Sequence, residues 1–313
     1  MNLKEAVHDH DLLLMEAAVS EIMSQREDVA VHPRLGAAPC IDDPRGREVL
    51  RELYRGFISV ARRADIPLLV RAPTWRTNQE RIAEAGLDRD INRHALEFMR
   101  SIQEEAGPFG AMMSVGGLLG CRNDAYRPDQ GLSPDQAASF HAWQAERLAE
   151  AGAEYLMAAT LPAVPEALGM ARAMTATGLD VVISFVINRQ GRILDGHPLA
   201  EAFSIIDRGC SPRPLGYMIN CAYPSFFQAS SEPEEVFQRL IGYQANGSSL
   251  DHAELDKAQG LLADDIADWA HRMIELHARY GITILGGCCG TTSEHLEALV
   301  GLASGKADTL GFD

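Results

Sequence analysis

The side chains best suited to chemistry in this sequence are two adjacent cysteines, Cys288 and Cys289, within the run GGCCG at 286–290. Thr291 and Glu294 follow at the spacing of a capping box, which predicts a helix that begins just after the cysteines. The free N–H groups and dipole of a helix N-terminus favour thiolates. Neighbouring Cα atoms are only ~3.8 Å apart, whereas disulfides usually span ~4.4–6.8 Å, so a disulfide within the pair is disfavoured. Metal binding explains the pair better.

A third cysteine, Cys221, ends a predicted strand at 216–221. If this strand and the one before Cys288 belong to one parallel barrel, both end at the same face and the three thiols can converge. Three thiolates suit Zn²⁺ and leave a fourth position for a substrate or water, as in catalytic zinc sites. The placement alone leaves an alternative, in which Cys221 is only a small buried side chain and the cysteine pair only a tight turn.

The elements that must position these cysteines alternate along the chain, with short apolar runs followed by longer helical patterns. Most of the apolar runs are continuous, as expected for strands buried on both faces. We therefore expect an α/β protein with a closed (β/α)8 TIM barrel rather than an open doubly wound sheet. The eight expected strands are at 12–19, 66–71, 110–115, 154–160, 180–186, 216–221, 240–245 and 282–286. Helical patterns occur at 47–63, 133–151, 164–177, 199–207, 234–240 and 265–280.

The chain is expected to form one domain over residues 1–313, because no internal repeat and no Pro-rich or Gly/Ser-rich linker divides it. Segments 20–44 and 122–131 lack clean periodicity and are expected to be irregular loops at the catalytic end of the barrel. His8 and His10 are assigned to a solvated N-terminal tail rather than to a metal site.

The composition is that of an ordinary globular protein, with 46% hydrophobic and 23% charged residues. The 28 Lys and Arg against 44 Asp and Glu give a net charge of −16, which disfavours nucleic acid and anionic membranes as partners. No export signal and no apolar stretch of ~18 residues are evident, so we expect a cytoplasmic protein with reduced cysteines. The expected partners are small molecules, and the sequence is compatible with a homo-oligomer.

The GGCCG motif with Thr291, together with Asn220 before Cys221, resembles the zinc-binding signature of the homocysteine S-methyltransferase family. Weaker similarities follow in order along most of the chain. The resemblance implies a barrel in which Cys221, Cys288 and Cys289 hold Zn²⁺. It also implies methyl transfer in methionine biosynthesis, from a sulfonium or ammonium donor to homocysteine or another small thiol that the zinc keeps as a thiolate.

Two carboxylates of the family pattern are altered in this chain. Glu16 stands where the first strand of the family ends in aspartate, and both nearby family glycines are absent. Ala159 replaces the glutamate that resembles the binding group for the acceptor's ammonium in the family. A site that no longer pairs an ammonium is expected to discriminate less strongly for an amino-acid acceptor.

We expect Trp75, Thr160, Asn220 and Asn246 to bind substrate and Glu16 to have a catalytic role. Trp75 can face the cation of an onium donor, or it can simply pack beside Pro73. Asn246 matches an asparagine in a loop of the family, and the alternative is an ordinary turn residue.

A second class of function is a zinc-dependent hydrolase or lyase that activates water, with Glu16 as the general base. A metal with three thiolate ligands is electron-rich and therefore acidifies water poorly, which favours alkyl transfer. A non-catalytic metal sensor is a third alternative.

Overall fold

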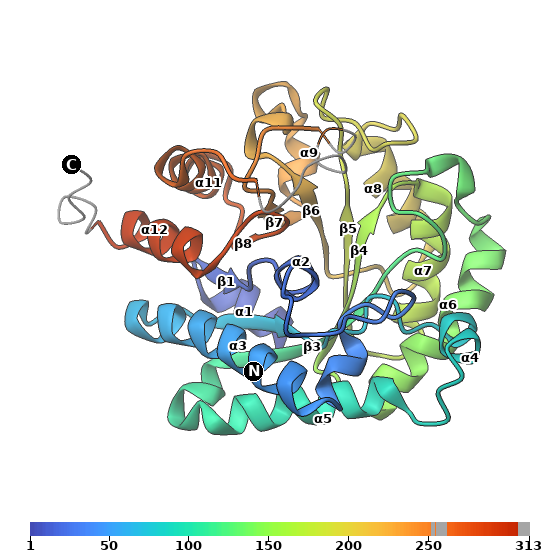
Figure 1. Ribbon diagram of the computed structural model, residues 1–313. Coiled ribbons are helices and arrows are strands. Elements are labelled where there is room, and N and C mark those ends of the chain that lie inside the picture. Colours follow the sequence, from blue (N-terminus) through green and yellow to red (C-terminus); the bar gives the residue numbers. More distant parts are fainter. Residues whose placement is uncertain (252–253, 255–261, 306–313) are drawn as a thin grey trace.

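The computed structural model describes residues 1–251, 254 and 262–305, which contain a closed barrel of eight parallel strands in chain order (Figure 1). β1 closes the barrel because it pairs with both β2 and β8, through Leu14 with Leu68 and Leu13 with Ile284. The predicted TIM barrel is confirmed. The strands are β1 (Leu13–Met15), β2 (Leu68–Arg71), β3 (Met113–Leu119), β4 (Tyr155–Leu161), β5 (Asp180–Phe185), β6 (Gly216–Ala222), β7 (Leu240–Ala245) and β8 (Ile284–Gly287).

Helices surround the barrel and connect most of its strands (Figure 1). The longer ones are α3 (Pro44–Ala64), α5 (Ile91–Glu105), α6 (Pro134–Glu150), α7 (Val164–Thr175), α8 (Leu199–Gly209), α11 (Ile266–Tyr280) and α12 (Ser293–Ala303). The short α-helices are α1 (Leu3–Asp9), α2 (Ser20–Ser24), α4 (Gln79–Glu84) and α9 (Glu234–Phe237). Short 3₁₀ turns are η1 (Ala38–Ile41), η2 (Gly107–Met112), η3 (Pro128–Gln130), η4 (Pro224–Phe226) and η5 (Ala229–Ser231).

Several elements differ from the sequence prediction. The first strand, expected at 12–19, is only Leu13–Met15, and the expected irregular segment 20–44 contains α2 and η1. The helix α5 was not predicted, although its apolar residues recur at helical spacing and Asp90 caps its first turn. β3 begins later than expected because residues 107–112 form η2, which begins with Pro108 near its first position. α9 is shorter than expected because the chain enters β7 at Leu240.

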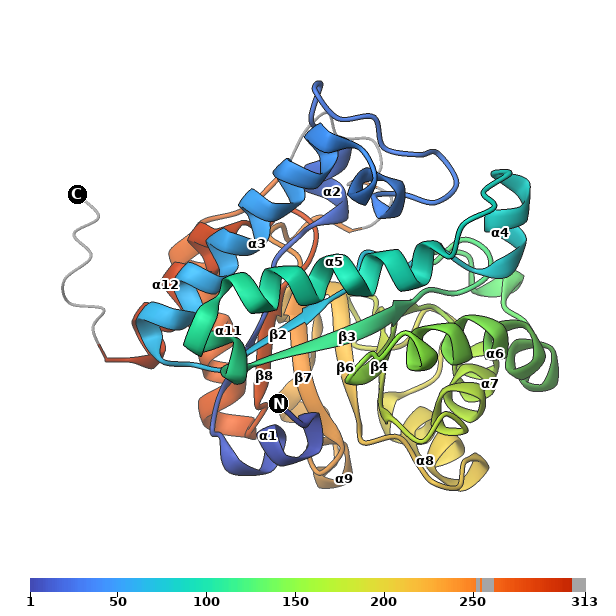
Figure 2. The same cartoon turned by 90° about the horizontal axis from the view of Figure 1, so that it is seen from below.

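The N-terminal residues form a helix that closes one end of the barrel. Leu3 and Ala6 of α1 are buried in the same cluster as Leu13, Met157 and Met218 from the barrel interior. The expectation of a tail is therefore wrong for residues 3–9, although His8 and His10 are exposed. Figure 2 shows α1 and α2 at opposite ends of the barrel, so the segment after β1 lies at the end where the strands terminate.

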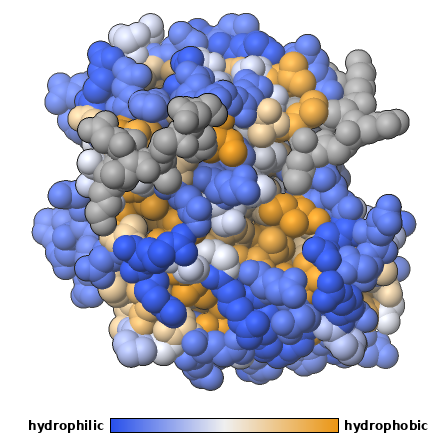
Figure 3. Space-filling view, turned by 60° about the vertical axis from the view of Figure 1, so that its left-hand side comes forward, coloured by the Kyte–Doolittle hydropathy of each residue, from blue (hydrophilic) through white to orange (hydrophobic). Residues whose placement is uncertain are grey.

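Among the described residues no second group of three or more His, Cys, Asp or Glu side chains is arranged to hold a metal ion. A groove of about 670 Å³ between α3, α11 and α12 is lined by no cysteine or histidine. The face in Figure 3 is mostly hydrophilic at its edges, and apolar side chains gather in its recessed middle, as expected for a layer of amphipathic helices. No helix among the described residues is long and apolar enough to span a membrane.

Candidate metal centre and active site

The three cysteines predicted as ligands lie together at the C-terminal end of the barrel. Cys221 lies near the end of β6, and Cys288 and Cys289 directly follow β8. Their sulfur atoms lie within 4.8 Å of one another, and the Sγ atoms of Cys221 and Cys288 are 2.7 Å apart. All three are free thiols at the floor of a pocket of about 420 Å³. Around one zinc ion tetrahedral sulfur ligands are roughly 3.8 Å apart, so a small movement lets this set hold one ion.

Two residues at the strand ends around this pocket have left-handed backbone angles. Cys221 has φ 53° and Thr160, near the end of β4, has φ 61°. The strand register shifts at both places, between Asn220 and Ala222 in β6 and between Ala158 and Leu161 in β4. Such irregularities turn a side chain away from its normal direction in a strand and are typical of functional sites. Here they bring the Cys221 sulfur beside the hydroxyl of Thr160, at 3.6 Å.

The cysteine loop after β8 depends on glycines and on Thr291. A Cβ atom on Gly287 would lie 2.1 Å from the Thr291 hydroxyl, and Gly290 has φ +78°. Thr291 donates to the Cys288 carbonyl at 2.6 Å. The predicted capping box is wrong by one residue, because α12 is capped by Thr292 with His295 as its partner. Thr291 instead holds the loop that presents the cysteines.

The packed thiols do not ionise independently. Hydrogen bonds from Cys221 and Cys289 hold the pKa of Cys288 well below its ordinary value, and the nearby Arg71 guanidinium acts in the same direction. The pKa of Cys221 is raised by its hydrogen bond with Cys288, and the pKa of Cys289 is raised by its contacts with Cys221 and Cys288. One thiol of the cluster is therefore ready to lose its proton, which is the first requirement for metal binding.

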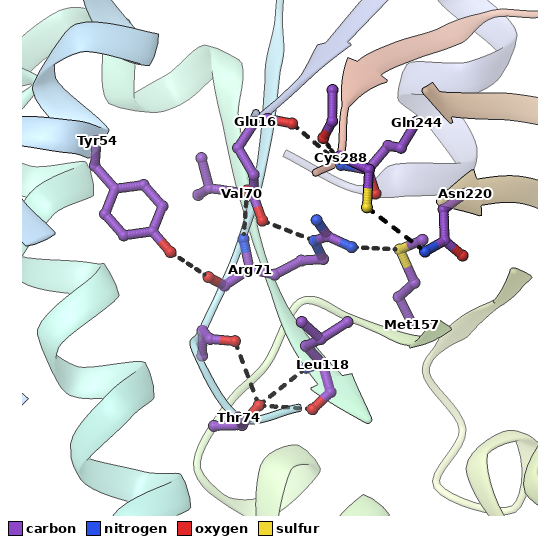
Figure 4. Close-up of polar contacts among 12 residues, drawn as sticks. Glu16, Tyr54, Val70, Arg71, Thr74, Leu118, Met157, Asn220, Gln244 and Cys288 are labelled. Carbon is purple, nitrogen blue, oxygen red and sulfur yellow. Dashed lines mark hydrogen bonds and ion pairs between the residues drawn. The ribbon is translucent and has the colours of Figure 1, made fainter. Parts of the chain in front are cut away.

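Asn220 connects the cysteines to β4. Its amide nitrogen donates to the Thr160 hydroxyl at 2.7 Å and to the Cys221 sulfur at 3.2 Å. The same nitrogen lies 4.0 Å from the Cys288 sulfur (Figure 4). Its Oδ1 accepts from the Thr160 N–H at 2.9 Å and from the Ser184 hydroxyl at 2.6 Å. Both Asn220 and Thr160 line the pocket, so their predicted role in substrate binding remains a prediction alongside this support of Cys221.

Replacing Asn220 with aspartate tests that support. The variant keeps the acceptor oxygen but loses both N–H donors and places a carboxylate beside the sulfurs. Zinc affinity is expected to fall roughly 10–100-fold, as for other groups that orient metal ligands. A competition titration with a zinc chelator measures it. The matched control is Asn188→Asp, because within the described part of the chain Asn188 bonds through its Oδ1 alone, as an acceptor from the N–H groups of Gln190 and Arg192. Equal zinc affinity in both variants would contradict this role of Asn220.

Glu16 is buried at the pocket floor, where it forms an ion pair with Arg71 at the end of β2. Its two carboxylate oxygens accept from the Arg71 side chain at 2.7 Å and from the Arg71 backbone N–H at 2.9 Å (Figure 4). Burial alone would lower the pKa of Arg71, but the charge and hydrogen bond of Glu16, together with Tyr155 and Cys288, outweigh it and the pKa is raised. The guanidinium therefore stays charged. Because both oxygens of Glu16 are engaged, the geometry does not favour this carboxylate as a general base for water.

The other predicted substrate-binding residues differ in position. Trp75 lines the pocket, its indole N–H donates to the Ala159 carbonyl at 3.0 Å, and the Arg76 guanidinium lies 4.3 Å from its ring centroid. A cation of the protein thus already covers one face of the ring. Asn246 is buried after β7 and does not line the pocket; its carbonyl accepts from the indole of Trp269. The structure brings Trp75 to the cysteines but not the Asn246 side chain.

Several pocket residues were not predicted, among them three polar side chains. Tyr126, in the loop after β3, contacts the thiol of Cys221. Burial raises the pKa of Tyr126, and the neighbouring cysteines raise it further. Glu21 in α2 accepts the Gly290 N–H at 2.6 Å, and Arg71 faces the cavity from β2. The sequence placed segments 20–44 and 122–131 at this end of the barrel, but nothing in their spacing singles out Glu21 or Tyr126.

Comparison with known proteins agrees with this architecture over most of the chain. Residues 13–302 match the family model described as homocysteine S-methyltransferase. The chain belongs to this family. Homocysteine S-methyltransferase of Escherichia coli (strain K12) is 23% identical, over 95% of this chain and 97% of that protein. Homocysteine S-methyltransferase YbgG of Bacillus subtilis (strain 168) is 27% identical over 64% of this chain and 61% of YbgG.

The fold agrees with a solved structure of similar size. The crystal structure of the homocysteine methyltransferase MmuM from Escherichia coli, in its metallated form, has a TM-score of 0.73 and 22% identity, and the match covers 98% of this chain and 99% of that one. Membership of the homocysteine S-methyltransferase family confirms the predicted family and the methyltransferase class. The triad of Cys221, Cys288 and Cys289 matches the zinc site expected of this family.

Proposed function

We propose that this protein transfers a methyl group from a sulfonium or ammonium donor to the sulfur of homocysteine, at a zinc site formed by Cys221, Cys288 and Cys289. The observation that carries the proposal is the convergence of the three sulfurs at the floor of a pocket of about 420 Å³, a size typical of small-molecule sites. Bound zinc would lower the pKa of the acceptor's thiol, which is ~8.5 for a free thiol, and so keep the sulfur as a thiolate.

The pocket wall suits the charge change of this reaction. A thiolate attacks the methyl carbon, a new S–C bond forms, and the donor leaves as a neutral thioether or amine. Opposite charges are neutralised, so a site with little water favours the transition state. Ala17, Val19 and Leu118 contribute apolar surface to the cavity, and Tyr126 covers the Cys221 sulfur. Trp75, held by its bond to Ala159, remains our candidate for contact with the onium donor.

The chain is further proposed to work as one catalytic domain over residues 1–313, acting on small molecules. A cytoplasmic location is part of the proposal, because a reducing compartment keeps the three thiols available for the metal.

A labelled-methyl experiment tests the reaction directly. The zinc-loaded protein is incubated with homocysteine and either a methylsulfonium or a trimethylammonium donor that carries deuterated methyl groups. Mass spectrometry is expected to show the labelled methyl on the acceptor sulfur. One donor class is expected to lose as many labelled methyl groups as the acceptor gains. Label recovered only as methanol would instead support the water-activating alternative. No transfer of label from either donor class would contradict the proposed reaction.

A further inference from the structure

Two side chains of opposite charge line the same pocket as the three cysteines, Arg71 at the end of β2 and Glu21 in α2. Glu21 accepts the N–H of Gly290, the residue that follows Cys289, at 2.6 Å. An acceptor bound in this pocket with its sulfur at the cysteines therefore has both charges in the wall around it.

Arg71 presents a fixed cation to the cavity. Its Nε is held by Glu16 at 2.7 Å and its Nη1 lies 3.4 Å from the Met157 sulfur (Figure 4). Within the described residues Nη2 has no hydrogen-bond partner. A guanidinium with one edge held in place offers its remaining N–H groups to a carboxylate in a defined direction. Ala159, which also lines the pocket, contributes no charge, and the Glu16 carboxylate is already paired with Arg71.

Glu21 presents a carboxylate to the same pocket. One oxygen accepts the Gly290 N–H, and Oε1 has no partner among residues 1–251, 254 and 262–305. No ion pair to Glu21 occurs in that part of the chain, although the side chain is half-buried. A partly desolvated carboxylate without a cation is costly, and an ammonium group on a ligand would offset that cost.

We propose that an amino-acid acceptor binds with its carboxylate on Arg71, its ammonium on Glu21 and its thiol at the cysteine cluster. This inference rests on the proposed function. It assigns the recognition of the ammonium to Glu21 in α2, because Ala159 stands where the family pattern has a glutamate. Arg71 and Glu21 are then the residues that select an α-amino acid thiol over other small thiols.

Three thiols and one variant test the assignment. Calorimetric titration of the zinc-loaded protein with homocysteine, 4-mercaptobutanoate and 3-aminopropane-1-thiol compares the full acceptor with analogues that lack the amino group or the carboxylate. Each analogue is expected to bind roughly 10–100-fold more weakly than homocysteine, because each lacks one charged group that forms hydrogen bonds with the protein. In Glu21→Gln, homocysteine and 3-aminopropane-1-thiol are expected to weaken about tenfold or more, whereas 4-mercaptobutanoate is expected to keep its Kd within about twofold.

The control is Glu232→Gln, because Glu232 is also half-buried with a pKa raised by burial but does not line the pocket. Equal weakening of all three thiols in Glu21→Gln would overturn the role of Glu21, since a structural effect would not discriminate among them. Similar Kd values of the wild-type protein for all three thiols would overturn both assignments while leaving methyl transfer to thiols intact. Binding of none of them by zinc-loaded protein would overturn the proposed function itself and this inference with it.

Discussion

Replacing Cys288 with alanine is expected to reduce methyl transfer by roughly 10⁴-fold or more and to release the zinc ion. The variant removes one of the three sulfurs that lie within 4.8 Å of one another, and it removes the thiol that most readily loses its proton. Without the metal, only a few per cent of a free thiol is ionised at neutral pH and nothing holds the sulfur in line with the donor methyl. Metal analysis of the purified variant and single-turnover assays measure the two effects.

Cys210→Ala is the matched control. Cys210 is also a free cysteine, but it is buried at the end of α8 and does not line the pocket. The control is expected to keep its zinc and to transfer methyl groups at the wild-type rate. Full zinc content and normal turnover in Cys288→Ala would contradict the ligand assignment.

Replacing Arg71 with methionine is expected to lower the free energy of unfolding by about 3–5 kcal/mol, because it leaves the buried Glu16 carboxylate without a cation. The side chains of Arg71 and Glu16 are only 10% and 3% exposed, so water cannot easily replace the lost partner. Urea denaturation of the zinc-loaded protein, followed by circular dichroism, measures the change.

The double variant Glu16→Gln with Arg71→Met separates charge from packing. It no longer contains an unpaired buried charge, so it is expected to be more stable than Arg71→Met alone. If the single variant loses less than ~1 kcal/mol, or the double variant is less stable than the single one, the ion pair does not stabilise the barrel as described.

The sequence predicted the barrel and the cysteine site for physical reasons that the structure bears out. Continuous apolar runs such as β4 and β6 are buried on both faces, and their length identifies them as strands. In a parallel barrel all strand ends meet at one face, so Cys221 and Cys288 could be expected to converge without knowledge of any contact.

Other features depend on tertiary contacts that spacing does not encode. Thr291 and Thr292 offer the same hydroxyl, and only the bond of Thr291 to the Cys288 carbonyl decides that Thr292 caps α12. Glu21 in the short helix α2 and Tyr126 in the loop after β3 reach the site through contacts with Gly290 and Cys221 respectively. Arg71 follows an apolar run, and only the barrel register shows that its side chain points inward to Glu16. Most of the charged lining of the pocket was therefore outside the reach of sequence analysis.

X-ray absorption at the zinc edge, with and without homocysteine, tests the central claim most directly. The protein is expected to bind about one zinc ion per chain, with sulfur ligands at ~2.3 Å from the cysteines. Homocysteine is expected to add one further sulfur to the coordination shell at the same distance, and the same addition is expected to be absent with methionine, which has no thiol. Zinc whose coordination shell is unchanged by homocysteine would contradict methyl transfer through a metal-held acceptor sulfur at this site.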